Sequence, residues 1–306
     1  MLTKRPKGSK ISLNLKGALT LNMAIKFSAD STCDLSPELL QRYHISIRPL
    51  YVVMDGEPKQ DGVSVTPDEM YAYTAATGKL CSTAAINVAD YLEFFRPLSQ
   101  ENEAVIHTCI SSEFSSCYQN ACLAAQEFDN VYVVDSRNLS TGHGLVVLEG
   151  IDLAAAGKSV PEILEGMLAV TARVSASFIP TDLEDLRKGG RCSAVAALGA
   201  NLLKLKPCIQ VQEGKMGVGK KYRGNMPQVL PTYVKEMLAQ PDTIDPRRVF
   251  ITHSGMDEAL IALVKETVES CMHFEEVLIT RAGGTVSSHC GPGTLGVLYI
   301  AENAVE

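Results

Sequence analysis

Strand-like and helix-like segments alternate along this chain from residue 24 onward, and this alternation constrains the fold more than any other feature. Short apolar runs such as AIKFSAD, EAVIHTCI and NVYVVDS are each followed by a segment of helical character. Alternation of this kind predicts an α/β fold built from packed layers. With 306 residues, 46% of them hydrophobic, the chain can bury the cores of two domains.

A change of pattern near residue 175 divides the chain. From SASFIP onward a second series begins, in which the strands RVFITHSG and FEEVLITRAGG flank the helical pattern MDEALIALVKETVESCM. We therefore predict an N-terminal α/β domain over residues 23–174 and a C-terminal α/β domain over residues 175–306. Residues 1–22 hold five basic side chains and no acid, which predicts a flexible basic extension.

Several helix starts carry capping signals. Ser36 precedes a proline at the first helical position, and Ser159 is placed in the same way. Thr66 is followed by a proline and then by Glu69, which completes a capping box. These signals fix where three of the predicted helices begin.

The charge balance argues against a nucleic-acid-binding protein. The chain carries 28 basic and 35 acidic side chains, a formal net charge of −7. Because residues 1–22 hold five of the basic groups, the remainder carries 23 basic against 35 acidic side chains. A body this acidic should not bind nucleic acid broadly. No apolar run approaches the ~18 residues of a membrane-spanning helix, so no integral membrane association is expected.

Cysteine and histidine usage gives no metal site. The nine cysteines are scattered without C-x-x-C pairs or zinc-finger spacing, which predicts reduced thiols and a cytoplasmic protein. His44 and His273 have no ligand partner at metal spacing, and His107 lies inside an apolar strand as a packed core histidine would. We predict neither a metal nor a cofactor.

Two glycine-rich segments match nucleotide-binding motifs only in part. GPGTLG at residues 291–296 fits G-x-G-x-x-G, but a strand-like segment follows it where the motif requires a helix. GKMGVGKK begins like a P-loop, but Lys221 stands where Ser or Thr should hold magnesium. Gly224 and Pro227 argue against a long helix there, so we predict a β-hairpin after the strand PCIQVQ. We predict no ATP site.

Three stretches place polar groups as one ligand site would need them. CSTAAIN sets Ser82 and Thr83 before a helical pattern, and SSEFSS, residues 111–116, lies between a strand and a helix. The third is His289 with GPG behind it. Open α/β sheets bind ligands at the carboxyl ends of strands, where helix N-termini offer free N–H groups to anions. Taken alone, each serine cluster is more often a simple helix cap.

Catalytic motifs are absent from the sequence, while basic residues concentrate in one segment. THSGM around Ser254 is not the G-x-S-x-G of an esterase, and we assign no catalytic residue. Between Arg187 and Arg223 lie nine Lys or Arg residues and one acid, Glu213. On an acidic protein such a segment indicates either docking to an acidic surface or phosphate, or a solvated face.

Taken together, these stretches resemble the DegV family of bacterial fatty-acid-binding proteins. The resemblance runs from about Ile25 to Glu302 and follows the family's order of motifs. It is carried by SADSTCDLS, DGVSVTPDEMY, STAAINVADY, ISSEFSSCYQNA, VVDSRNLSTGHG, DLEDLRKGGRCS, LKLKPCIQ and SSHCGPGTLG. The family implies two α/β domains with a fatty acid in a tunnel between them, its carboxylate held by hydroxyls and a histidine.

The resemblance also implies individual site residues. Thr83 corresponds to the family's carboxylate-binding threonine, with Ser82 as the alternative, because the family pattern T-S-Q-P-S is replaced after Thr83. Ser115 corresponds best to the ligand serine, with Ser112 as second choice, and His289 to the histidine before G-P-G.

Two arginines are implied less directly, and a function follows. Arg191 and Arg223 match positions associated with the interdomain site or partner docking. The resemblance implies a non-catalytic carrier that presents a long-chain fatty acid to a separate dihydroxyacetone-kinase-like subunit, which phosphorylates the carboxylate. The apolar segments AVAALGANLLKL and GLVVLEGIDL would line the slot or form core helices. Two alternatives are a Ser/His-dependent acyl-group hydrolase or phosphotransferase, and a scaffold that docks through the basic segment.

Overall fold

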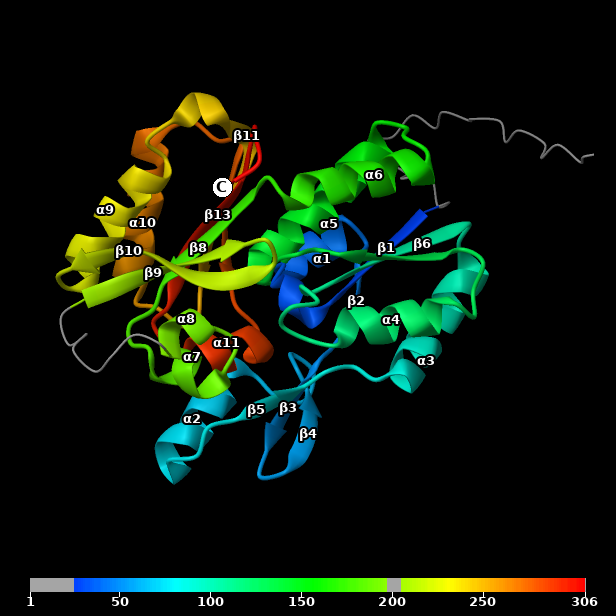
Figure 1. Ribbon diagram of the computed structural model, residues 1–306, viewed down its shortest axis with the longest axis horizontal. Coiled ribbons are helices and arrows are strands. Elements are labelled where there is room, and N and C mark those ends of the chain that lie inside the picture. Colours follow the sequence, from blue (N-terminus) through cyan, green and yellow to red (C-terminus); the bar gives the residue numbers. More distant parts are fainter. Residues whose placement is uncertain (1–24, 197–204, 306) are drawn as a thin grey trace, which may run out of the picture.

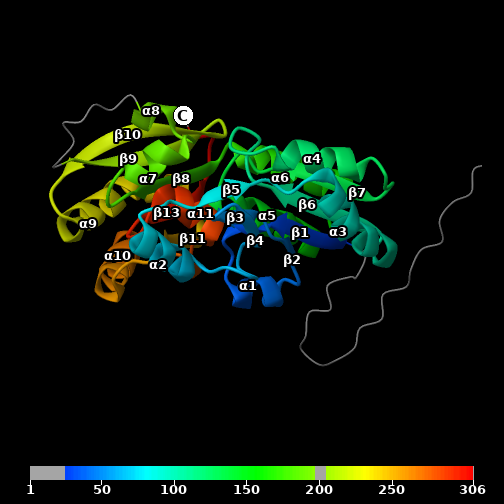
Figure 2. The same ribbon diagram turned by 90° about the horizontal axis from the view of Figure 1, so that it is seen from below.

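The computed structural model describes residues 25–196 and 205–305, which form two α/β lobes side by side (Figure 1). The proposed extension over residues 1–22 lies outside the described residues, as does most of the segment AVAALGANLLKL. Seen from below, helix α11 and a small sheet lie between the two lobes (Figure 2).

A parallel four-stranded sheet, in the order β2-β1-β6-β7, organises the N-terminal lobe. Helices α5 and α6 contact it on one side, and α3 and α4 on the other (Figure 1). All six residues of β6 are buried, and four of them are apolar, as expected of a parallel strand that is covered on both faces. The elements of this lobe are β1 (Ile25–Asp30), η1 (Ser31–Cys33), α1 (Pro37–Arg42), β2 (Ser46–Arg48), α3 (Val88–Glu101), β6 (Ala104–Cys109), α4 (Cys117–Ala125), β7 (Val131–Asp135), α5 (Ser140–Ala155) and α6 (Val160–Thr171).

A mixed six-stranded sheet, in the order β10-β9-β8-β13-β11-β12, forms the C-terminal lobe. Only β11 and β12 pair in parallel, and the other neighbours are antiparallel. Its elements are β8 (Val174–Ile179), α7 (Glu184–Gly189), α8 (Ser193–Ala196), β9 (Leu205–Gln212), β10 (Lys215–Arg223), α9 (Met226–Met237), η2 (Pro241–Thr243), β11 (Ile244–His253), α10 (Glu258–Cys271), β12 (Glu276–Arg281), α11 (Gly284–Cys290) and β13 (Leu295–Ala301).

A third, antiparallel sheet in the order β4-β3-β5 was not predicted. It consists of β3 (Tyr51–Met54), β4 (Glu57–Gln60) and β5 (Ser82–Ala84), with α2 (Pro67–Thr77) inserted between the last two strands. Asp55 and Gly56 turn the chain between β3 and β4 with φ of 51° and 85°, the left-handed values that a tight hairpin needs.

Two hydrophobic cores stabilise the lobes. The first packs the four-stranded sheet against its helices and continues onto β8 and β13 through Ala176, Phe178 and Leu298. The second lies between the six-stranded sheet and helices α9 and α10. The segment GLVVLEGIDL belongs to α5, whose residues Leu145 to Leu148 are buried in the first core, so it is a core helix.

The capping and hairpin predictions are confirmed. Ser36 accepts a hydrogen bond from the Leu39 N–H at 3.4 Å, and Thr66 with Glu69 forms the expected capping box. The segment that begins like a P-loop is the antiparallel pair β9–β10. Glu213 and Gly214 form its turn with φ of 49° and 81°.

One expectation about the following segment is wrong. Helix α9 begins at Met226, two residues after Gly224, and it includes Pro227, although these residues argue against a long helix. Asn225 caps it by accepting from the Gln228 N–H at 3.2 Å. Pro227 lies in the first turn, where a missing N–H breaks no helical hydrogen bond.

Two kinds of feature are missing from the part of the chain that the structure describes. Among its helices, none combines the length and apolar character that crossing a bilayer would require. Within residues 25–196 and 205–305, no three His, Cys, Asp or Glu side chains gather as a metal ion would need.

Candidate functional site

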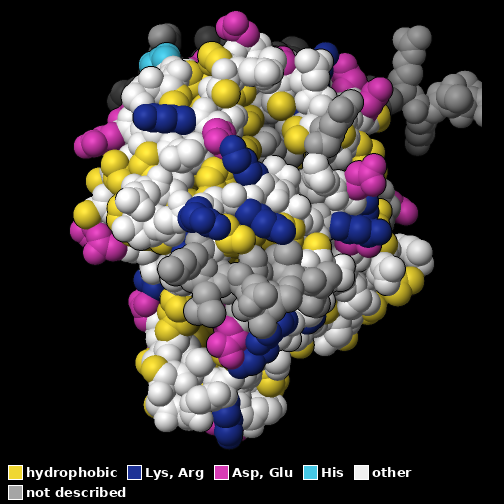
Figure 3. Space-filling view, turned by 60° about the vertical axis from the view of Figure 1, so that its left-hand side comes forward, with side chains coloured by type: hydrophobic (Ala, Val, Ile, Leu, Met, Phe, Trp, Pro, Cys, Tyr) yellow, Lys and Arg dark blue, Asp and Glu magenta, His cyan; other side chains and the backbone are white. Residues whose placement is uncertain are grey.

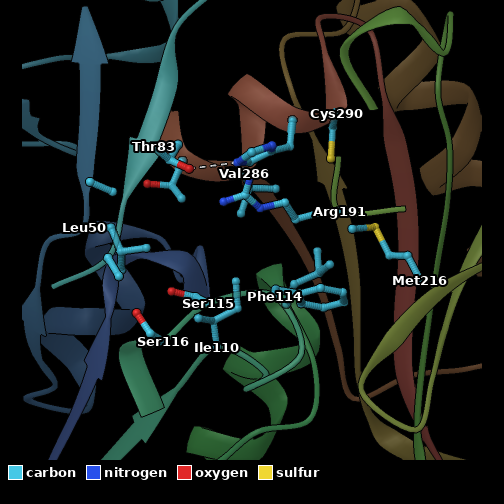
Figure 4. A pocket seen from close by; sticks show the side chains of 15 residues that line it. Leu50, Thr83, Ile110, Phe114, Ser115, Ser116, Arg191, Met216, Val286 and Cys290 are labelled. Atoms are coloured by element: carbon cyan, nitrogen blue, oxygen red, sulfur yellow. Dashed lines mark hydrogen bonds between the residues drawn. The ribbon is translucent and has the colours of Figure 1, made fainter. Parts of the chain in front are cut away.

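A cavity of about 320 Å³ lies where the two lobes and the small sheet meet (Figure 4). This volume lies at the lower end of the range of small-molecule sites, about 300–1,000 Å³. Its wall is mostly apolar, with hydroxyls, one imidazole and one guanidinium among the lining groups. The lining residues are Leu50, Thr83, Ala84, Ala85, Ile110, Phe114, Ser115, Ser116, Leu139, Arg191, Met216, Thr285, Val286, His289 and Cys290.

Thr83 and His289 meet in this cavity. Thr83 Oγ1 lies 2.9 Å from His289 Nε2, although 206 positions separate the two residues (Figure 4). Thr83 belongs to strand β5, where it pairs with Val52 of β3. The expected helix, α3, follows this strand, and Asn87 caps it by accepting from the Asp90 N–H at 2.9 Å. Ser82, the alternative, is exposed and does not line the cavity.

His289 lies on a helix and not on a loop, which corrects the sequence interpretation. It occupies the last turn of α11, and Gly291 follows as the C-cap with φ of 73°. Burial lowers the pKa of His289 to about 4, and the positive charge of Arg191 adds to the effect. The imidazole is therefore neutral near pH 7. Its buried Nδ1 has no hydrogen-bond partner among the described residues.

Helix α7 packs closely against this imidazole. A Cβ atom added to Gly189 would lie 2.4 Å from His289 Nδ1, closer than any real contact allows. Glycine at the end of α7 therefore permits the backbone to approach the Nδ1 edge of the ring closely. This contact confines the Nδ1 edge of the imidazole, while Thr83 contacts its Nε2.

Two buried carboxyl groups hold the N-terminus of α11. Asp34 Oδ1 accepts from the Gly283 N–H at 2.8 Å. Asp61 accepts from the Gly284 and Thr285 N–H groups at 2.6 and 2.9 Å. The aspartates come from the N-terminal half of the chain, more than 220 positions before the helix. The sequence gives no local signal for this attachment, and we did not predict it.

Of the four serines of SSEFSS, two line the cavity and two do not. Ser115 and Ser116 line the cavity, and Ser115 Oγ accepts from the Cys117 N–H at 3.2 Å at the start of α4. Ser111 is buried and donates to the Gly214 carbonyl at 2.8 Å, which joins the N-terminal lobe to the β9–β10 turn. Ser112 does not line the cavity, and its N–H donates to Asp135 at 3.3 Å.

The two candidate arginines lie in different places, and only one of them lines the cavity. Arg191 lines the cavity, and its Nη1 donates to the Gly189 carbonyl at 2.8 Å (Figure 4). Arg223 is exposed at the end of β10 and does not line the cavity. Several lysines of the basic segment are paired with acids, for example Lys215 with Glu113 at 3.5 Å. Figure 3 shows basic side chains interspersed with acidic and apolar ones on one face. Lys204 lies outside the described residues.

No described serine hydrogen-bonds to His289. Ser254 donates to the Gly291 carbonyl instead. The one Ser–His hydrogen bond in the described chain joins Ser28 Oγ and His107 Nδ1 at 3.0 Å, and both side chains are fully buried. His107 packs against aromatic rings of α3, which confirms it as a core histidine.

A family profile and a relative both match this sequence over nearly its whole length. The sequence profile described as "Uncharacterised protein, DegV family" matches residues 24–302. A DegV domain-containing protein of Clostridium perfringens is 31% identical over 282 residues, which cover 91% of this chain and 99% of that protein.

Solved structures match closely as well. The DegV family protein from Thermus thermophilus, described by its fatty acid binding, superposes with a TM-score of 0.84 at 31% identity, covering 91% of this chain and all of that one. A protein from Eubacterium ventriosum described as binding stearic acid gives 0.78 at 26% identity, covering 91% and 98%. Profile, relatives and fold agree over nearly the whole length: this chain belongs to the DegV family.

Proposed function

We propose that this protein binds a long-chain fatty acid, with the carboxylate held by Thr83, Ser115 and His289. The observation that carries the proposal is the 2.9 Å contact of Thr83 and His289 at the edge of a mostly apolar cavity. Relatives described as fatty-acid-binding proteins share the fold at 31% and 26% identity. Ser112 and Arg223, which do not line the cavity, are not part of this proposed set.

The chemistry of these groups suits a buried carboxylate. Burying an isolated charge is costly unless hydrogen-bond donors replace water. Hydroxyls donate to a carboxylate, and a neutral imidazole offers either a donor or an acceptor according to its tautomer. Arg191, on the same cavity, adds a positive charge. The low pKa of His289 rises when a carboxylate approaches, since an opposite charge favours the protonated form.

The apolar wall supplies the affinity for the tail. Each buried methylene contributes about 0.8 kcal/mol, so a dozen carbons contribute roughly 10 kcal/mol before ordering costs. Leu50, Ile110, Phe114 and Met216 offer such contacts around the cavity (Figure 4).

Organic extraction of protein purified from its native host, followed by mass spectrometry, tests the proposal. We expect about one long-chain fatty acid for each chain, and depletion of that acid in His289→Ala. Protein that retains no acid after purification and takes up none when incubated with fatty acid would contradict it. Steady hydrolysis of an acyl ester would instead favour the acyl-group hydrolase, for which no described serine hydrogen-bonds to His289.

We propose further that the protein is a carrier without catalysis of its own, and that it presents the carboxylate to a dihydroxyacetone-kinase-like subunit. The family resemblance and the position of Arg191 at the cavity support this role. Loaded protein, ATP and such a subunit from the same organism should together yield an acyl phosphate that hydroxylamine traps. Formation of that product without the subunit would contradict the carrier role.

We propose a cytoplasmic location because the cysteines are free thiols. All nine cysteines lie among the described residues, and none forms a disulfide. Free thiols persist in reducing compartments. Fractionation of the native host with an antibody against this protein tests the location, and recovery in the secreted fraction would contradict it.

A further inference from the structure

A second, smaller void of about 30 Å³ lies beside the main cavity. The two share three lining residues: Leu139, at the start of α5, and Val286 and Cys290, both on α11. All three side chains are buried. These three side chains therefore lie between the two spaces, and we refer to them as the wall.

The void is lined mostly by apolar groups, and its one imidazole, His253, accepts from the Gly255 and Met256 N–H groups at Nδ1. Its hydroxyls are engaged within the protein: Ser140 with Asp34, Ser177 with Tyr233, Thr252 with Thr280, Ser254 with the Gly291 carbonyl and Thr294 with the Cys290 carbonyl. Ala176, Phe178, Val211 and Leu298 complete an apolar lining. Because these polar groups already have partners in the protein, the space suits the end of an alkyl chain.

Helix α11 places the wall next to the polar end of the site. Thr285 and His289 lie one turn apart on one stripe of the helix, and Val286 and Cys290 lie on the next stripe. The first stripe includes the contact to Thr83, and the second borders both spaces. A chain that starts at His289 therefore meets the wall from within the main cavity.

We propose that Leu139, Val286 and Cys290 set the upper length of the acyl chain, and that the void behind them is an unused extension of the binding space. The inference rests on the proposed fatty-acid binding. A chain that fills the main cavity ends at this wall, and a longer chain is rejected because the wall side chains occupy its path. Opening the wall joins the void to the cavity and admits longer chains.

The size of the void fixes the expected change. A space of about 30 Å³ holds two groups of the size of a water molecule or a methylene. Each buried methylene changes affinity about fourfold. Joining the void should therefore raise the ratio of bound acids two carbons longer to the original ones by about 15-fold.

The experiment compares Leu139→Ala, at the N-cap of α5, with a matched control within that helix. Leu148 is as buried as Leu139 but lines neither space, so Leu148→Ala removes the same atoms without opening the wall. Delipidated proteins are incubated with an equimolar mixture of saturated acids of 12 to 20 carbons, and the bound acids are identified by mass spectrometry. We expect Leu139→Ala alone to shift toward longer chains.

A second substitution keeps the test decisive. Ala176 lines only the void, so Ala176→Val fills it. Combined with Leu139→Ala, it should return the bound acids to the original lengths. If Leu139→Ala fails to fold, Val286→Ala opens the same wall and should show a smaller shift in the same direction.

The outcomes separate this inference from the proposed function. Bound acids of unchanged length in the folded wall variants would overturn the wall while leaving fatty-acid binding intact. A shift that Ala176→Val does not reverse would also overturn it, because the gained space would then lie elsewhere. Absence of bound acid in every variant, the unsubstituted protein included, would overturn both.

Discussion

Replacing Asp34 with asparagine should remove a large part of the pH dependence of stability in this protein. The Asp34 side chain is almost fully buried, with a relative exposure of 6%. Oδ1 accepts from the Gly283 N–H at the start of α11, and Oδ2 lies 2.5 Å from Ser140 Oγ. Burial raises the pKa of Asp34 to about 8, and the negative charges of Asp61 and Asp30 add to this shift. The carboxyl group is therefore protonated in the folded protein at neutral pH.

The sign and size of the effect follow from linkage. An unfolded chain loses this proton near pH 3.9, whereas the folded protein keeps it to about pH 8. The stability that the proton provides is complete below about pH 4 and is lost as the pH rises through 8. Between these limits the free energy of unfolding falls by about 1.4 kcal/mol for each pH unit, or about 2.7 kcal/mol from pH 5 to pH 7.

Asparagine imitates the protonated acid. Its amide oxygen can accept from the Gly283 N–H, its NH₂ can donate to Ser140 Oγ, and it tolerates the φ of 49° at this position. Urea unfolding of both proteins at pH 5, 6 and 7 measures the difference between their free energies of unfolding. The contributions of titratable groups that both proteins share cancel in this difference. We expect the free energy of unfolding of Asp34→Asn, relative to that of the original protein, to increase by about 1.4 kcal/mol for each pH unit. A difference that stays constant over this range would refute the reasoning.

Three further substitutions test the site. Thr83→Val should weaken fatty-acid retention at least tenfold with little change in the free energy of unfolding. The control Ser82→Ala changes an exposed neighbour and should leave retention unchanged. Equal retention in the two variants, measured by ligand extraction, would contradict this. Gly189→Ala should displace the His289 ring, because its Cβ would lie 2.4 Å from Nδ1; an unshifted imidazole NMR signal would argue against that packing. Ser111→Ala should cost about 1 kcal/mol by freeing the β9–β10 turn, and unchanged proteolysis at that turn would speak against it.

Much of the fold is encoded locally and could be predicted from the sequence. The apolar strand β6 and the capped helix α2 depend on neighbouring residues, such as Thr66 with Glu69. The hairpin β9–β10 depends on the turn at Glu213 and Gly214. The family resemblance, carried by short motifs in order, then indicated two α/β lobes, and the solved structures confirm that fold.

The parts that were missed depend on distant contacts. Helix α11 has glycines at both ends, which is a pattern typical of a loop. Asp34 and Asp61, from the N-terminal half of the chain, cap this helix. Strand β5 spans three residues and exists because β3 offers an open edge. Among four clustered serines, spacing alone could not show that Ser111 binds the hairpin and Ser115 faces the cavity.

A crystal structure of the protein with its extracted ligand bound tests the central claim most directly. The account predicts a carboxylate within hydrogen-bonding distance of Thr83 Oγ1 and His289 Nε2, with the alkyl chain in the 320 Å³ cavity and its end against Leu139. A fatty acid bound elsewhere, with this cavity empty, would contradict it.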